Sequence, residues 1–245
     1  MDKLHNTQAL ETVYSRMLRL NLRQITLCGT NRKSGNSELA LAIAKRAAES
    51  GKHVLLVELS HYSPCLHERL NLVRNEWLPL TGHWEHAAQA TQYSGLVLLS
   101  CPEKSIHCVE FKDQETLKAF FDSCEQRFDL VICDAAPLLA SKKTFEDDLI
   151  IREEAICVDS LCAASKATLL TIISGVTTET QINESNEILK QTGAVLAGVI
   201  MNDCFTPSLQ QELIRESHRL DRFFPNWMEK IRQRLSRMVL LNQEL

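Results

Sequence analysis

The chain has 245 residues, of which 44% are hydrophobic and 24% are charged, and its formal net charge is −4 at pH 7. This composition is ordinary for a globular protein with a large core, and the charge gives no general argument for binding nucleic acid. No apolar run approaches the roughly 20 residues that span a bilayer, and the polar N-terminal residues lack the apolar core of a signal peptide. We therefore expect a cytoplasmic protein.

Helix and strand signals alternate along the first part of the chain. Amphipathic spacing predicts a helix over residues 8–22, and an apolar run predicts a strand over 24–28. A long Ala- and Leu-rich helix is expected over 37–50 and should end at Gly51, because glycine commonly follows the last helical residue. The next strand, 53–58, is apolar on both faces, as in a parallel sheet covered by helices.

The rest of the chain continues this pattern after a less regular stretch at 66–92. Strands are predicted over 96–100, 128–134, 167–173 and 195–201, and helices over 113–127 and 179–191. The alternation predicts one α/β domain over residues 1–207, doubly wound, with a mainly parallel sheet flanked by helices. Residues 208–245 form the one composition shift, and we expect a C-terminal helical extension there.

This extension carries an apolar stripe beside many basic residues. The stripe consists of Trp227, Ile231, Leu235 and Met238. Such a helix can dock on its own domain or on a partner helix, or it can lie on an anionic membrane surface. The sequence leaves these alternatives open.

Nine cysteines suggest no metal site. None of them forms a C-x-x-C pair, and their number is odd. His83 and His86 share a helix-like face, but two ligands without a third are weak evidence for zinc. Reduced thiols in a reducing compartment are the better interpretation.

The most informative segment runs from Ile25 to Ser37 and joins a strand to a long helix. This is the context of a phosphate-binding loop, in which backbone N–H groups and the helix N-terminus point at phosphate oxygens. Gly35 and Ser37 stand where the glycine and serine of a G-K-S motif belong, but Asn36 occupies the position of the lysine. The scaffold therefore indicates a nucleotide site, whereas its chemistry indicates an impaired one.

Polar residues end three of the predicted strands. Asp134 follows four apolar residues, and a carboxylate at this point can orient a water molecule bound to Mg²⁺. Glu58 ends a second strand, and Asn202 ends a third with an amide that could hydrogen-bond a purine. Asp134 and Asn202 also have purely structural interpretations, because a strand-end acid can cap a helix and an Asn can form a turn.

Together these segments resemble the cytoplasmic domain of bacterial tyrosine kinases of capsule and exopolysaccharide synthesis, within the partition-type and division-site P-loop ATPases. The resemblance extends from about Arg16 to Pro207. It implies a P-loop NTPase-like fold, with ATP and Mg²⁺ as cofactors. It implies nucleotide contacts at Gly29, Lys33, Gly35, Asn36, Ser37, Glu38, Glu58 and Asn202.

The resemblance also implies metal, catalytic and interaction residues. Ser37 and Asp134 would bind Mg²⁺, and Asp134 would be the catalytic residue of an active member. Arg16 and Arg19 belong to an R-x-x-R-x-N-L helix that mediates subunit contacts in relatives, so a homo-oligomer is possible on this resemblance. The glutamate that precedes this motif in the family is replaced by Val13.

The departures from the family indicate a loss of activity. Asn36 replaces the lysine, Lys33 replaces a glycine, and Glu58 and Ser60 replace two aspartates. Asn cannot supply a cation, and a side chain in place of glycine can obstruct the approach of a ligand to the backbone. The chain has three tyrosines and none in its C-terminal tail, where family kinases autophosphorylate.

We therefore expect a catalytically degenerate, cytoplasmic regulatory or binding subunit that works with membrane-bound polysaccharide assembly proteins and binds no nucleic acid. ATP and Mg²⁺ binding should be weak or lost. Two alternatives remain. One is an active ATPase or kinase in which Lys33 supplies the missing charge, and the other is a partition- or division-type positioning ATPase.

Overall fold

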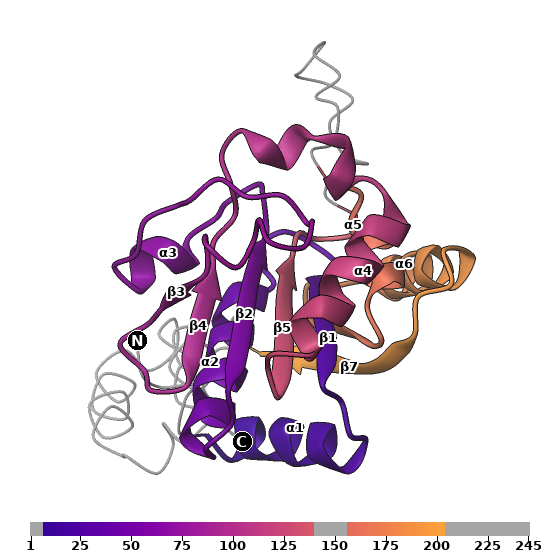
Figure 1. Cartoon of the computed structure of the whole chain (residues 1–245). Helices are drawn as coiled ribbons and strands as arrows, with labels where there is room; N and C mark the ends of the chain where they lie inside the picture. The colour runs from indigo at the N-terminus through magenta and orange to yellow at the C-terminus, as the bar shows by residue number, and fades with distance from the viewer. Residues whose placement is uncertain (1–6, 140–155, 204–245) are drawn as a thin grey trace, which may run out of the picture. The chain divides into compact units, whose positions relative to one another are not determined.

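The computed structural model describes residues 7–139 and 156–203 (Figure 1). Its centre is a sheet of seven strands in the order β3-β4-β2-β5-β1-β6-β7. The strands are β1 (Gln24–Gly29), β2 (Val54–Leu59), β3 (Gln89–Ala90), β4 (Leu96–Leu99), β5 (Leu130–Ala135), β6 (Thr168–Ile173) and β7 (Leu196–Asn202). All neighbouring pairs are parallel except β3 with β4. The predicted mainly parallel α/β architecture is confirmed.

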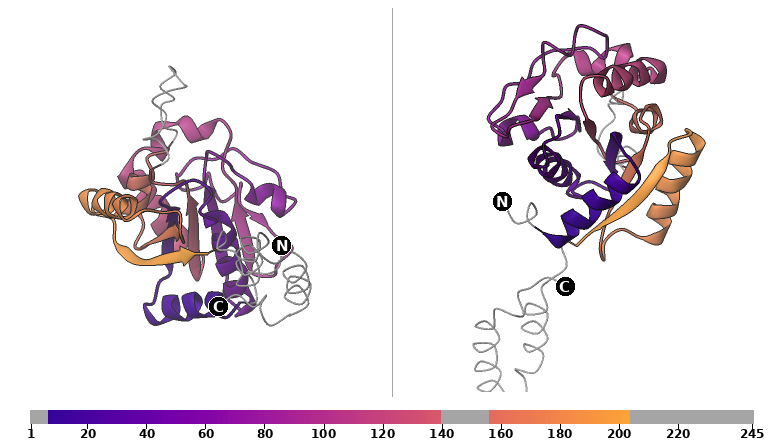
Figure 2. Two further views of the ribbon diagram at one scale, coloured as in Figure 1. Left: turned by 180° about the vertical axis from the view of Figure 1, so that it is seen from behind. Right: turned by 60° about the horizontal axis from the view of Figure 1, so that its bottom comes forward.

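Helices cover both faces of this sheet (Figures 1 and 2). They are α1 (Gln8–Arg19), α2 (Asn36–Glu49), α3 (Leu66–Arg69), α4 (Gln114–Glu125), α5 (Val158–Ala164) and α6 (Glu179–Gln191), with 3₁₀ turns η1 (Ser105–His107) and η2 (Val109–Phe111). The apolar sides of α1 and α2 form one core with the sheet. Those of α4 and α5, together with Leu189 of α6, form the other. Strands β1, β2, β5 and β6 are consequently buried along their whole length.

Most predicted elements agree with the structure to within a few residues. The first helix ends at Arg19, three residues earlier than expected, because Asn21 has a left-handed φ of 51° and the Leu22 N–H bonds back to the Met17 carbonyl. Helix α5 and the two-residue strand β3 were not predicted, since both are too short to show a periodic pattern. Gly51 follows the end of α2 with φ 85°, as expected.

Three of the expectations concern segments that the structure does not cover. The domain boundary at residue 207, the extension 208–245 and its apolar stripe lie outside the described residues. Among the described residues, every helix is too short or too polar to cross a membrane.

Candidate functional site: the loop between the first strand and its helix

Residues 30–35 connect β1 to α2 in a tightly turned loop. Gly35 precedes the helix with φ 75°, and Lys33 has φ 62°, so both lie in the left-handed region. A Cβ atom on Gly29 would approach the Ser34 Oγ to 2.1 Å, so the loop folds back closely over the end of β1. These positions explain the glycines, and Lys33 holds a conformation that glycine adopts without strain.

The loop leaves a series of backbone donors open. Within the part of the chain that the structure describes, the N–H groups of residues 32–38 donate no hydrogen bond to another backbone group, and no side chain caps α2. Unpaired N–H groups at the start of a helix form a favourable environment for an anion. This part of the site therefore fits a phosphate group.

Asn36 is turned inward, below the loop. Its side chain is buried, and its Nδ2 donates to the Leu27 carbonyl at 2.9 Å, to the Asp134 Oδ1 at 2.8 Å and to the Ala135 carbonyl at 3.2 Å. The Thr171 hydroxyl donates to the Asn36 Oδ1 at 3.1 Å. Asn36, at the position where the resemblance predicts a lysine, thus connects β1, β5 and β6 through hydrogen bonds.

Asp134 is fully buried beneath the first turn of α2. Its Oδ1 accepts from Asn36, while its Oδ2 has no partner among the described residues. Burial raises the pKa of this carboxyl to about 7; hydrogen bonds from Ser37 and Asn36 oppose the shift, and the nearby Glu58 adds to it. A substantial fraction of Asp134 is therefore protonated near neutral pH.

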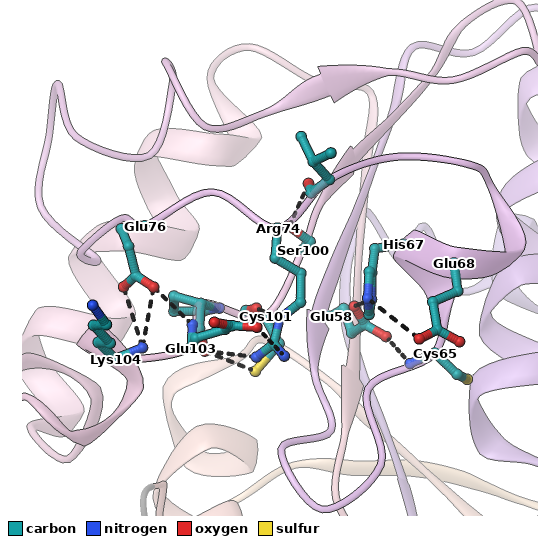
Figure 3. Close-up of polar contacts among 12 residues, drawn as sticks. Glu58, Cys65, His67, Glu68, Arg74, Glu76, Ser100, Cys101, Glu103 and Lys104 are labelled. Atoms are coloured by element: carbon teal, nitrogen blue, oxygen red, sulfur yellow. Dashed lines mark hydrogen bonds and ion pairs between the residues drawn. The ribbon is translucent and has the colours of Figure 1, made fainter.

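Glu58 lies beside Asp134, because the two residues are register partners on β2 and β5. Its Oε1 accepts the N–H groups of Cys65 and Leu66, each at 2.6 Å, and its Oε2 lies 3.5 Å from the His67 Nδ1 (Figure 3). Among the described residues, the partners of Glu58 are therefore Cys65, which precedes α3, and the first residues of that helix. This arrangement matches the structural interpretation of a strand-end carboxylate, a helix cap.

A neighbouring carboxylate, Glu76, has a similar role farther along the same region (Figure 3). It accepts the N–H groups of Glu103, Lys104 and Ser105 and the Ser105 hydroxyl. Partial burial opposes ionisation of Glu76, but the hydrogen bonds from Ser105 and from the backbone outweigh it and lower the pKa to about 2. Glu76 thus joins two loops and is not part of the candidate site.

Asn202 ends β7 and bonds to the loop near its end. Its Nδ2 donates to the Ser34 carbonyl at 2.8 Å, and it lies so close to Gly35 that a Cβ there would approach this Nδ2 to 2.3 Å. The structure therefore brings Asn202 to the loop, where its amide contacts the protein backbone. Its contact with a purine stays a prediction.

The positive charges of the site lie on its outer side. Lys33 and Arg32 are exposed, and the Arg32 guanidinium lies 4.9 Å from the centre of the Tyr62 ring. Arg69 pairs with Glu38 at 3.1 Å, beside the start of α2. Arg69 was not among the predicted site residues, because it belongs to a short helix in an irregular stretch.

Two further contacts of the loop come from residues that sequence reasoning missed. Thr171 on β6 bonds to Asn36, and Gln181 on α6 accepts a hydrogen bond from the Asn31 Nδ2 at 3.1 Å. Thr178 and Gln181 have the spacing of a capping box, which predicts a helix start but gives no sign of a contact with a loop 150 residues away in sequence.

The sequence matches no protein-family model and no curated protein. The structure, however, is similar to solved ones. The chimeric protein CapA2B2 gives a TM-score of 0.62 at 17% identity, with 79% of this chain and 82% of that chain covered. The kinase domain of the Escherichia coli tyrosine kinase ETK gives 0.62 at 16%, covering 78% and 71%.

A third similar structure is the septum site-determining protein MinD from Pyrococcus horikoshii, complexed with Mg-ADP. Its TM-score is 0.56 at 16% identity, with 74% of this chain and 70% of that chain covered. The fold is P-loop NTPase-like. At these identities the likeness concerns the fold, so the activity has to be argued from the residues of this chain.

Proposed function

We propose that this chain is a catalytically inactive relative of the bacterial tyrosine kinase domains, acting as a cytoplasmic regulatory or binding subunit in exopolysaccharide or capsule synthesis. The observation that carries the proposal is the position of Asn36. It stands where an active loop has its lysine, and its amide is engaged between three strands. Phosphoryl transfer depends on cations that neutralise the developing charge, and Asn36 supplies none.

The remaining residues fit a phosphate group but not Mg²⁺-dependent chemistry. The N–H groups of the loop are open to an anion, whereas the Asp134 carboxyl accepts a hydrogen bond from Asn36 and has a raised pKa. Glu58, the second buried carboxylate among the described residues, accepts hydrogen bonds from the N–H groups at the start of α3. The loop would therefore bind the phosphates of a nucleotide weakly and without turnover.

Two surfaces support a role in binding other proteins. Arg16 and Arg19 are exposed on α1, next to Leu18 and Leu20, whose side chains are 47% and 51% exposed. These residues are suited to contacts with a second copy of the chain or with a membrane-bound assembly protein. The apolar stripe and the basic residues in the sequence of 208–245 would also suit a partner or the inner face of a membrane.

Incubation of the purified protein with ATP and Mg²⁺ should give no phosphate release above background and no phosphotyrosine, because no described residue of the site turns a cation inward. Phosphate release measured over hours, together with a phosphotyrosine immunoblot, tests this expectation. Turnover that disappears in Asp134→Ala would contradict it.

Lys33 favours an alternative, an active ATPase with a rebuilt loop. Its side chain is exposed on the loop and forms no ion pair with any other described residue, so it could turn toward a bound nucleotide. Turnover abolished by Lys33→Ala but retained in Arg32→Ala would support this alternative. In an inactive protein both variants stay at background.

A further inference from the structure

Three side chains from residues 168–202 bond to the loop or to Asn36, the first residue of α2. Thr171 on β6 bonds to Asn36 at the end of the loop. Gln181 on α6 bonds to Asn31 near its start, at 3.1 Å, and Asn202 on β7 bonds to the Ser34 carbonyl, at 2.8 Å. The contacts of Gln181 and Asn202 fall on either side of Lys33.

Lys33 needs such support. A lysine with φ 62° is strained relative to glycine, because its Cβ crowds the backbone. Strained conformations persist only when the surrounding structure determines them, and the side chains of Arg32 and Lys33 are exposed. The hydrogen bonds at Asn31 and Ser34 therefore hold the loop in the shape that aligns its N–H groups.

Gln181 has two roles at one oxygen. Its Oε1 accepts from the Asn31 Nδ2 and also from the Thr178 N–H, at 3.0 Å, as part of the capping box that begins α6. The position of this oxygen is thus set by the start of α6. The position of the loop consequently depends on α6 as well as on the strands.

We propose that Gln181 is a positioning residue of the phosphate-binding loop, and that through Asn31 it holds the loop ready for the diphosphate group of a nucleotide. A loop that is ordered before binding loses less conformational entropy when the ligand binds. The proposal rests on the phosphate-binding loop of the proposed function and concerns its affinity, not its turnover.

The test is titration of the full chain with a fluorescent ADP analogue. Gln181→Ala and Asn31→Ala should each weaken binding by about threefold to tenfold, and the double variant should lose no more than either single variant. Thr178→Ala is the matched control, because it removes half of the capping box and leaves the Asn31–Gln181 bond. It should lower the melting temperature and leave the affinity unchanged.

Three results would overturn the proposal. The first is an unchanged affinity in Gln181→Ala, and the second is an equal loss in Thr178→Ala, which would assign the effect to the stability of α6. The third is a wild-type protein that binds no ADP analogue at millimolar concentration. ATP turnover by the wild type would instead overturn the proposed function. The role of Gln181 would then still be decided by the affinities of the variants for the ADP analogue.

Discussion

Asn36→Ala should destabilise the protein by about 2–4 kcal/mol, which lowers the melting temperature by roughly 5–12 °C. The alanine removes the donor that serves Leu27, Asp134 and Ala135 and the acceptor of Thr171. Buried polar groups that lose their partners bear the full cost of desolvation. Thermal and urea unfolding of the two proteins at pH 7 measure the difference.

Two variants make this test specific. Glu38→Ala, two residues along the same helix, removes an exposed ion pair with Arg69 and should change stability by less than about 1 kcal/mol. Asn36→Asp has the same shape but places a second carboxyl against Asp134, so it should be less stable at pH 8 than at pH 5. A melting temperature of Asn36→Ala within 2 °C of the wild type would show that the amide is dispensable.

Asp134→Asn should be more stable than the wild type at pH 8, by roughly 2–4 kcal/mol. Because burial raises the pKa of Asp134 from 3.8 to about 7, the folded protein holds a proton that the unfolded chain has already released between these values. Wild-type stability from this group therefore falls as pH rises from about 4 to 7, and it stays low above pH 7. Asparagine has no proton to lose and avoids this cost.

The gain of Asp134→Asn should accordingly shrink as the pH is lowered and vanish near pH 4. Urea unfolding of both proteins at intervals between pH 5 and 8 measures the trend. Glu115→Gln, at an exposed position of α4, serves as the control and should differ from the wild type by a small amount that is constant with pH. A variant that is less stable at every pH would mean that hydrogen bonds to the Asp134 carboxylate outweigh its desolvation.

The elements of this fold that the sequence predicts are those whose signals lie within a few neighbouring residues. The apolar runs of β1, β2, β5 and β6 are long and continuous, and burial on both faces requires such runs. The glycine after α2 and the amphipathic spacing of α4 act within a few residues, so they are visible in the sequence. Helix α5 and strand β3 are stabilised by tertiary packing and leave too short a pattern to detect.

The candidate site divides in the same way. Strand ends carry Glu58, Asp134 and Asn202, and the sequence alone places all three at the carboxyl edge of a parallel sheet, because parallel strands end at one edge. The sequence also shows that the loop carries Lys33 and leads into Asn36, where the family resemblance predicts a glycine and a lysine. What these residues contact depends on neighbours that are distant in sequence.

Only the tertiary structure decided those contacts. Asn36 reaches Asp134 and Thr171 across 98 and 135 residues of sequence, and Asn31 reaches Gln181 across 150. An amide or a carboxylate can bind a ligand, a helix end or a neighbouring side chain with equal chemical ease, and the choice is made by what the folded sheet brings within hydrogen-bond distance. The sequence therefore determined the scaffold and the identity of the loop residues, whereas packing determined that Asn36 joins the strands and that side chains of α6 and β7 bond to the loop.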